Sequence, residues 1–132
     1  KSKLAKKFTN LKLFLQNSNF LIISAKLTNK TENFFDRKNL KYLPKESNII
    51  NISRGEIIIE KDLIKLIKNK HIKKVGLDVL KDEHKLLKSE NKLIKLSRIN
   101  KNIIISPHIA GLTYNSEFKA LNEIKKLIIK NF

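Results

Sequence analysis

The chain has 132 residues and no cysteine, which excludes disulfide bonds and thiolate metal sites. Hydrophobic residues make up 41% of it, enough for one domain with a core, and no apolar run approaches the roughly 20 residues that span a bilayer. The net charge of +17 results from 26 lysines and only 3 arginines, scattered along the whole sequence, against 12 acidic residues. Nucleic-acid-binding surfaces rely more on arginine and exposed aromatic side chains, so we expect a solvated lysine surface and no specific nucleic-acid site.

The chain also lacks methionine, and its first residues lack the long apolar stretch of a signal peptide. Because an open reading frame begins with methionine, we expect a chain that has been trimmed or processed or, in preference to both, a fragment of a longer protein. The absence of cysteine is consistent with a reducing compartment, and we expect a cytoplasmic protein without contact to a membrane.

Short apolar runs and amphipathic segments alternate along the sequence. In chain order, we predict a helix over 11–16, a strand over 20–24, a polar loop over 26–32, a helix over 34–43 that ends before Pro44, a strand over 48–52, a helix over 60–70, a strand over 73–80, a helix over 86–96, a strand over 103–106 and a long helix over 113–131. Strands that are apolar on both faces and alternate with helices indicate a parallel sheet covered on both sides. The fold class we predict is α/β, a doubly wound parallel sheet or half of one.

Three chemically active residues each follow one of the predicted strands. Arg54 comes after the run 48–53, Glu83 after the run 75–80, and His108 after the run 102–107. In an open parallel sheet, ligands bind at the carboxyl ends of the strands. A cation, a carboxylate and an imidazole gathered there could hold an acidic substrate and move a proton.

The surroundings of these residues support a site without deciding it. Gly55 allows a sharp turn after Arg54, whose planar guanidinium suits a carboxylate, although a surface arginine in a loop is the alternative. Asp78 falls within an apolar run, where a carboxylate needs a partner, and it could equally be a cap or turn residue. Glu83 alone is an ordinary loop residue, and Asp82 beside it would compete for any role.

The motifs taken together resemble one enzyme family. They are Phe20-Leu-Ile-Ile-Ser-Ala-Lys-Leu-Thr, Asn51-Ile-Ser-Arg-Gly-Glu, Gly76-Leu-Asp-Val and Ser106-Pro-His-Ile-Ala-Gly. In order and spacing they resemble the signatures of the D-isomer-specific 2-hydroxyacid dehydrogenases, which include D-3-phosphoglycerate dehydrogenase. The resemblance extends from about Leu11 to the last helix.

The resemblance implies that residues 1–132 are the C-terminal half of a Rossmann-type NAD-binding domain. The glycine-rich half and the substrate-binding domain would then lie outside this chain. The parent enzyme would move a hydride between NAD, or NADP, and the 2-carbon of a small 2-hydroxy or 2-oxo acid such as phosphoglycerate, glyoxylate or hydroxypyruvate. Relatives are commonly dimers, so a homodimer is expected of the full-length enzyme.

The resemblance also implies roles for individual residues. Arg54 would bind the carboxylate and 2-oxygen of the substrate, His108 would be the general acid/base, and Glu83 would orient His108. Asp78 would accept a hydrogen bond from the nicotinamide carboxamide. The other residues implied to line the cofactor, besides Arg54 and His108, are Ala25, Lys26, Ile52, Ser53, Ala110 and Gly111. No metal is expected.

Four features depart from the family pattern. Lys26 replaces a proline, Ile59 replaces the acid that caps the following helix, and His84 replaces the proline after the catalytic glutamate. A lost cap weakens a helix by about 1 kcal/mol. No G-x-G-x-x-G turn for the pyrophosphate occurs, so we expect the chain alone to be inactive and only marginally folded.

Two alternatives of other classes remain. The chain could be a non-catalytic module that senses a nucleotide through the same fold, although the presence of Arg54, Glu83 and His108 argues against it. It could also be a basic nucleic-acid-binding protein, which a steep dependence of binding on salt would indicate.

Overall fold

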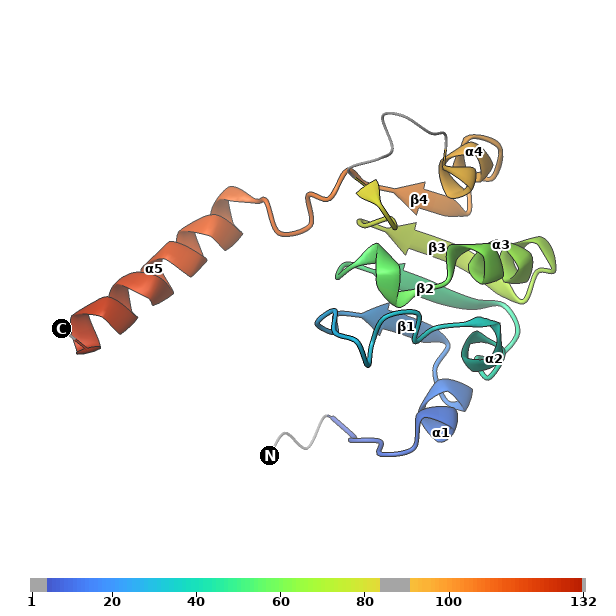
Figure 1. The fold of residues 1–132 in the computed structure, drawn as a ribbon, viewed down its shortest axis with the longest axis horizontal. Coiled ribbons are helices and arrows are strands. Elements are labelled where there is room, and N and C mark those ends of the chain that lie inside the picture. The colour runs from blue at the N-terminus through green and yellow to red at the C-terminus, as the bar shows by residue number, and fades with distance from the viewer. Residues whose placement is uncertain (1–4, 84–90, 132) are drawn as a thin grey trace.

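The computed structural model describes residues 5–83 and 91–131, and side chains as far as residue 126. Within these ranges the chain forms one sheet of four parallel strands in the order β1-β2-β3-β4. The strands are β1 (Phe20–Ile23), β2 (Ser47–Asn51), β3 (Ile72–Leu77) and β4 (Ile103–Ile105). All four point the same way, so their carboxyl ends meet at one edge of the sheet (Figure 1). The predicted α/β class with a parallel sheet is confirmed.

The helical segments are α1 (Leu11–Gln16), α2 (Arg37–Leu40), the 3-10 turn η1 (Gly55–Ile57), α3 (Glu60–Lys68), α4 (Lys92–Ile99) and α5 (Tyr114–Asn131). α3 contacts β3 and α4 contacts β4, while α2 contacts both α1 and α3. Because each crossover moves the chain on to the next strand in the same direction, with the same right-handed sense, the helices between the strands lie on one side of the sheet. α5 instead extends away from the sheet (Figure 1).

The core lies between this helical layer and the sheet. α3 contributes Leu63, Leu66 and Ile67 at helical spacing, and alternate strand residues such as Ile49 and Val75 meet them. Burial of each such side chain contributes about 1.5–3 kcal/mol. This packing holds the sheet against its helices, and the parallel pairing of the strands brings the loops at their carboxyl ends together.

The opposite face of the sheet differs from the expectation of a sheet covered on both sides. Phe20, Ile22 and Ile104 point to that face and are 65%, 59% and 70% exposed. Phe118 and Leu121 of α5 are exposed as well. Among the described residues, both faces of the strands are therefore apolar, but helices cover only one face of the sheet.

Several predicted boundaries need correction. The helix predicted over 34–43 is wrong in length, because only Arg37–Leu40 is helical. Phe35 instead forms an isolated parallel bridge with Ile58, and Asp36 caps the helix by accepting a hydrogen bond from the Asn39 amide at 2.8 Å. α3 ends at Lys68, two residues before the predicted end.

The predicted strand over 73–80 is also too long. β3 ends at Leu77, so Asp78 lies just past the strand and not within it. The helix predicted over 86–96 begins at Lys92, after Asn91 caps it, and residues 84–90, including His84, lie outside the described residues. Thr113 caps the start of α5, since its hydroxyl accepts a hydrogen bond from the Ser116 amide at 3.2 Å. The missing cap at Ile59 is confirmed.

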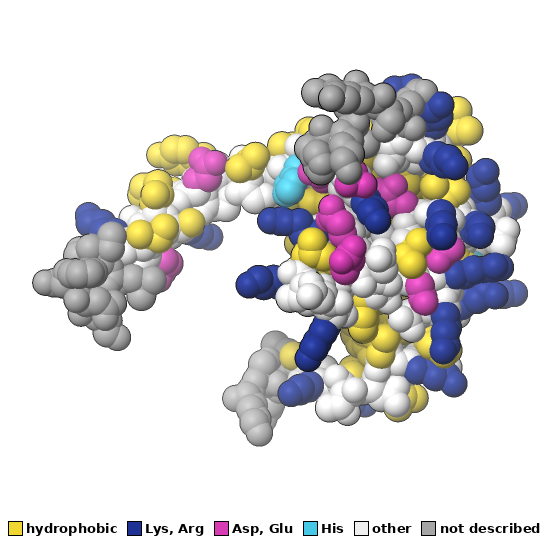
Figure 2. Space-filling model, viewed as in Figure 1, with side chains coloured by type: hydrophobic (Ala, Val, Ile, Leu, Met, Phe, Trp, Pro, Cys, Tyr) yellow, Lys and Arg dark blue, Asp and Glu magenta, His cyan; other side chains and the backbone are white. Residues whose placement is uncertain are grey.

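Lysine and arginine side chains are spread over the visible face of the molecule, with acidic side chains between them (Figure 2). Within the described part of the chain, no helix is both long enough and apolar enough to cross a membrane.

Candidate active site

The turns that follow β2, β3 and β4 bring the three candidate catalytic residues to the same edge of the sheet. Arg54 lies three residues past the end of β2, Glu83 six past the end of β3, and His108 three past the end of β4. The turns touch one another: Gly55 packs directly against the backbone of Leu80 and Lys81. The structure thus gathers all three residues from segments that are far apart in the sequence.

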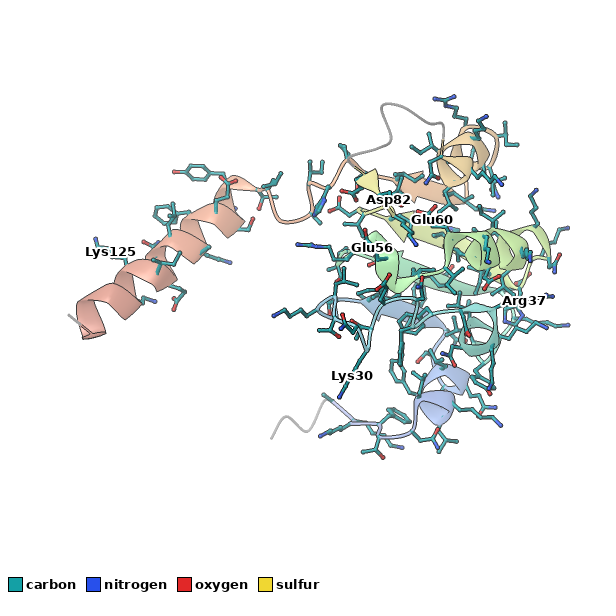
Figure 3. The ribbon with its side chains drawn as sticks, viewed as in Figure 1. Lys30, Arg37, Glu56, Glu60, Asp82 and Lys125 are labelled. Atoms are coloured by element: carbon teal, nitrogen blue, oxygen red, sulfur yellow. The ribbon has the colours of Figure 1, made fainter. Side chains whose placement is uncertain are left out.

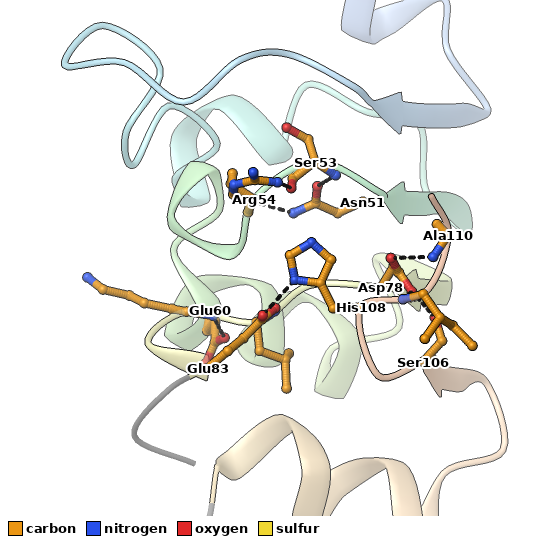
Figure 4. Close-up of polar contacts among 12 residues, drawn as sticks. Asn51, Ser53, Arg54, Glu60, Asp78, Glu83, Ser106, His108 and Ala110 are labelled. Carbon is orange, nitrogen blue, oxygen red and sulfur yellow. Dashed lines mark hydrogen bonds and ion pairs between the residues drawn. The ribbon is translucent and has the colours of Figure 1, made fainter. Parts of the chain in front are cut away.

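The turn that carries Arg54 is held by the last residue of β2. Asn51 is 1% exposed, and its Oδ1 accepts a hydrogen bond from the Ser53 amide at 3.1 Å. Its Nδ2 donates to the carbonyl of Arg54 at 2.9 Å. Both polar groups of the amide are therefore used to close the turn, which leaves the Arg54 side chain exposed at the edge, with Nη1 donating to the Ser53 carbonyl at 2.7 Å (Figure 4).

Glu83 and His108 form a direct pair. Nδ1 of His108 donates to Oε2 of Glu83 at 2.8 Å, since a carboxylate can only accept. The other Glu83 oxygen, Oε1, accepts a hydrogen bond from the Leu80 amide at 2.6 Å, so the carboxylate is itself oriented. The side chains are 47% and 34% exposed for His108 and Glu83 respectively. The pairing fixes the ring orientation and leaves Nε2 of His108 for an incoming group.

Asp78 lies beneath the turn that carries His108 and is 5% exposed. Its Oδ1 accepts hydrogen bonds from the Ser106 hydroxyl at 2.6 Å and the Ile109 amide at 2.9 Å, and its Oδ2 accepts from the Ala110 amide at 2.9 Å. Burial raises the pKa of Asp78, but these hydrogen bonds and the charge of His108 more than offset it, so the pKa lies below its ordinary value. Asp78 is therefore a charged carboxylate with several protein donors.

Two hollows open beside these residues. A cavity of about 540 Å³ lies between the β3 and β4 ends and α4, and its lining includes Asp78, Glu83, Arg98 and His108. A second hollow lies at the ends of β1 and β2, and its lining is Ser24, Ala25, Lys26, Leu27, Ile52, Ser53 and Arg54.

The second hollow gathers five of the residues expected to line a cofactor, namely Ala25, Lys26, Ile52, Ser53 and Arg54. The Ser53 hydroxyl donates to the Ala25 carbonyl, which ties the two strand ends together. The expected contacts Ala110 and Gly111 lie instead in the exposed turn between β4 and α5 and line neither hollow.

Sequence reasoning missed three residues that support the site. Asn51 and Ser106 have no individual role in the sequence analysis, although each is a polar residue at the end of an apolar run and could have been noticed there. Glu60 accepts hydrogen bonds from the Lys81 amide and from Nδ2 of Asn91, both at 2.9 Å. It lies at the start of α3, near the segment that carries Asp82 (Figure 3), and no local pattern could have predicted its distant partners.

Comparison with known proteins decides the family. The model of the D-isomer specific 2-hydroxyacid dehydrogenase family, NAD binding domain, matches residues 1–110 of this chain. The chain belongs to this family.

Its similarity to individual dehydrogenases is moderate. It is 30% identical over 113 residues to a glyoxylate reductase of Thermococcus kodakarensis, which covers 86% of this chain and 32% of that protein.

Solved structures of the same family share the fold. A D-lactate dehydrogenase of Aquifex aeolicus, complexed with NAD and lactic acid, is 25% identical with a TM-score of 0.77, over 91% of this chain and 39% of that one. A D-isomer specific 2-hydroxyacid dehydrogenase of Xanthobacter autotrophicus, in complex with NADPH and MES, is 29% identical with a TM-score of 0.67, over 76% of this chain and 30% of that one. The chain therefore spans about a third of the length of the relatives it matches.

Proposed function

We propose that the enzyme containing this chain transfers a hydride between a nicotinamide cofactor and the 2-carbon of a small 2-hydroxy or 2-oxo acid. The observation that carries the proposal is the 2.8 Å pair between His108 and Glu83 at the carboxyl edge of the sheet. The Arg54 turn packs against the same segment through Gly55. A proton relay and a carboxylate anchor are what this reaction requires of the protein.

Each residue then has a distinct task. Arg54 binds the substrate carboxylate through its planar guanidinium, which holds the 2-carbon in place. In the direction of reduction, Nε2 of protonated His108 gives its proton to the 2-oxygen as the carbonyl becomes a hydroxyl. In the direction of oxidation, neutral His108 takes that proton back. Glu83 holds the ring by its Nδ1 and stabilises the imidazolium form, which gives up its proton in reduction and is formed in oxidation.

The residues present fit the nicotinamide end of a dinucleotide. The hollow at the β1 and β2 ends has backbone groups near Ala25 and Ser53 and cationic side chains at Lys26 and Arg54, which suits a ligand that carries ribose and phosphate groups. We assign Asp78 to the carboxamide, since three protein donors leave its two oxygens with room for one more. When bound, NAD or NADP supplies or accepts the hydride. The chain contains no G-x-G-x-x-G turn, so the pyrophosphate is assigned to residues beyond this sequence.

Further details of the full enzyme belong to the same proposal. The substrate is a small acid of the class of glyoxylate, hydroxypyruvate or phosphoglycerate. The described residues form part of a doubly wound domain, with a glycine-rich half and a substrate-binding domain outside residues 1–132. We propose a cytoplasmic homodimer without specific affinity for nucleic acid. The glyoxylate reductase from Thermococcus supports the choice of substrate class.

The test is oxidation of NADH or NADPH by the full-length enzyme with a panel of 2-oxo acids, beside the 132-residue chain alone. We expect turnover by the full enzyme and none by the chain alone. His108→Gln should lower kcat by about 10²–10⁴-fold, the usual contribution of a general acid. The matched control is His71→Gln, because His71 lies at the other edge of the sheet, where its carbonyl accepts from the Glu46 amide.

The outcomes separate the alternatives. If the full enzyme binds NADH but turns over none of the acids, the non-catalytic nucleotide-sensing module becomes the better interpretation. If the chain binds generic duplex DNA with a steep dependence on salt and ignores nucleotides, the nucleic-acid-binding alternative takes its place. Equal loss of activity in His108→Gln and His71→Gln would show that His108 has no special role.

A further inference from the structure

His108 has an unusual backbone conformation. Its φ is 56°, in the left-handed region that non-glycine residues adopt at a cost of roughly 1–2 kcal/mol. Such a conformation persists only where the surroundings hold it. The pair with Glu83 is too exposed to do this alone, since ion pairs between partly exposed side chains are worth little.

The donors that Asp78 binds lie on both sides of His108 in the chain. Ser106 is two residues before it, and the Ile109 and Ala110 amides follow it directly. The buried carboxylate thus closes the turn from both ends, as Figure 4 shows for Ser106 and Ala110. A carboxylate suits this position because both oxygens only accept, whereas an asparagine would place an NH₂ group opposite one of the donors.

Asp78 is itself held at a fixed place. Its amide donates to the Asn51 carbonyl at 2.9 Å, and Asn51 in turn closes the Arg54 turn. The register of the sheet pairs Leu77 with Ile105, so that Ser106 comes beside Asp78, and the Ser106 amide donates to the Leu77 carbonyl at 2.9 Å. The ends of β2, β3 and β4 therefore meet at this one aspartate.

We propose that Asp78 is a positioning residue, whose carboxylate holds the left-handed turn of His108 and thereby presents the imidazole to Glu83. The proposal rests on the proposed function only in naming His108 as the acid/base. Its structural content, that removing the carboxylate releases the turn and uncouples His108 from Glu83, needs no substrate.

The experiment is an NMR comparison of the full-length enzyme, without substrate, with its Asp78→Asn variant. We expect hydrogen exchange at the Ile109 and Ala110 amides to rise by roughly tenfold or more, because hydrogen bonds to a charged acceptor are lost. The ¹⁵N and ring-proton signals of His108 should move toward those of the Glu83→Gln variant, in which the pair is removed directly. Amides of β2 and α3 should keep their exchange rates.

Two further variants keep the outcome decisive. Glu46→Gln removes the same charge at the opposite edge, where Glu46 pairs with Lys73 at 3.2 Å, and should leave all His108 signals unchanged. Ser106→Ala removes only one of the hydrogen bonds to Asp78, and it provides the test if Asp78→Asn does not fold. It should shift the His108 signals in the same direction by a smaller amount. Unchanged His108 signals and Ile109 exchange in both Ser106→Ala and a folded Asp78→Asn, or equal acceleration at every amide, would overturn the proposal. Because no reaction is measured, failure of the proposed activity would leave this result untouched.

Discussion

Gly55 and Leu80 lie backbone against backbone, although 25 residues separate them in the chain. A Cβ on Gly55 would overlap the carbonyl group of Leu80 and the nitrogen of Lys81. This contact joins the turn that carries Arg54 to the segment whose Leu80 amide orients Glu83. The relative placement of the guanidinium and the Glu83–His108 pair therefore depends on the absence of one methyl group.

Gly55→Ala should consequently destabilise the chain and displace the two turns from each other. Because the overlap is with backbone, which cannot move aside cheaply, we expect a loss of about 3 kcal/mol in the free energy of unfolding of the full-length enzyme. Chemical denaturation measures it. The matched control is Gly111→Ala, where a Cβ would meet nothing within 4 Å and the change should stay within about 0.5 kcal/mol. Equal effects of the two substitutions would contradict the assigned contact.

Lys70 offers a stabilising substitution. Its φ is 57°, and it follows the end of α3, the position at which glycine most often ends a helix. Lys70→Gly should raise the free energy of unfolding by about 1 kcal/mol, because the left-handed strain is removed. Lys65→Gly, within α3, should lower it by about 1 kcal/mol. A loss of stability in both variants would show that Lys70 is not strained.

The uncapped start of α3 leads to a second stabilising change. Ile59 occupies the N-cap position with extended backbone and provides no side-chain hydrogen bond to the first turn. Ile59→Asp should add such a bond and stabilise the chain by about 1 kcal/mol, as measured by thermal or chemical denaturation. Ile59→Ala, which removes the same apolar atoms without adding an acceptor, is the control. If both variants lose stability equally, the cap does not form.

The pKa of Asp78 sets a dependence of stability on pH. Since the folded-state pKa lies below the ordinary value of 3.8, the carboxylate contributes stability that is fully present above that value. The contribution is lost as the pH falls from the ordinary pKa through the lower folded one. Unfolding titrations should show this acid loss in the parent chain and a shallower one in Asp78→Asn, which lacks the contribution at neutral pH too. If stability fell equally steeply with acid in the parent and in Asp78→Asn, the lowered pKa of Asp78 would be contradicted.

The planar guanidinium of Arg54, and not only its positive charge, should determine how tightly the enzyme binds the acid. Arg54→Lys in the full-length enzyme keeps the charge but loses the planar fork, so we expect KM for the 2-oxo acid to rise by about tenfold or more. Arg37→Lys at the start of α2 is the control, since it lies at the other edge of the sheet, beside Glu46 and His71. Steady-state kinetics give both values. An unchanged KM in Arg54→Lys would remove Arg54 from substrate binding.

The alternation of apolar runs and amphipathic helices determined the parallel sheet, because a strand buried in such a sheet must be apolar and the crossovers must be long. That alternation also placed Arg54, Glu83 and His108 at the carboxyl ends of strands. Element limits were harder, as 34–43 shows: Asp36 starts the helix late, and Phe35 pairs with the distant Ile58.

What the tertiary structure alone decided is how the site is held. The partners of Asp78 lie 28–32 residues away, and Glu60 binds groups 21 and 31 residues downstream. No local pattern encodes these contacts, because they depend on the register between strands and on how closely two turns approach. The residue types of the candidate site can be recognised in the sequence. The hydrogen bonds of the buried carboxylate, the left-handed backbone of His108 and the contact at Gly55 arise only when the strands lie side by side.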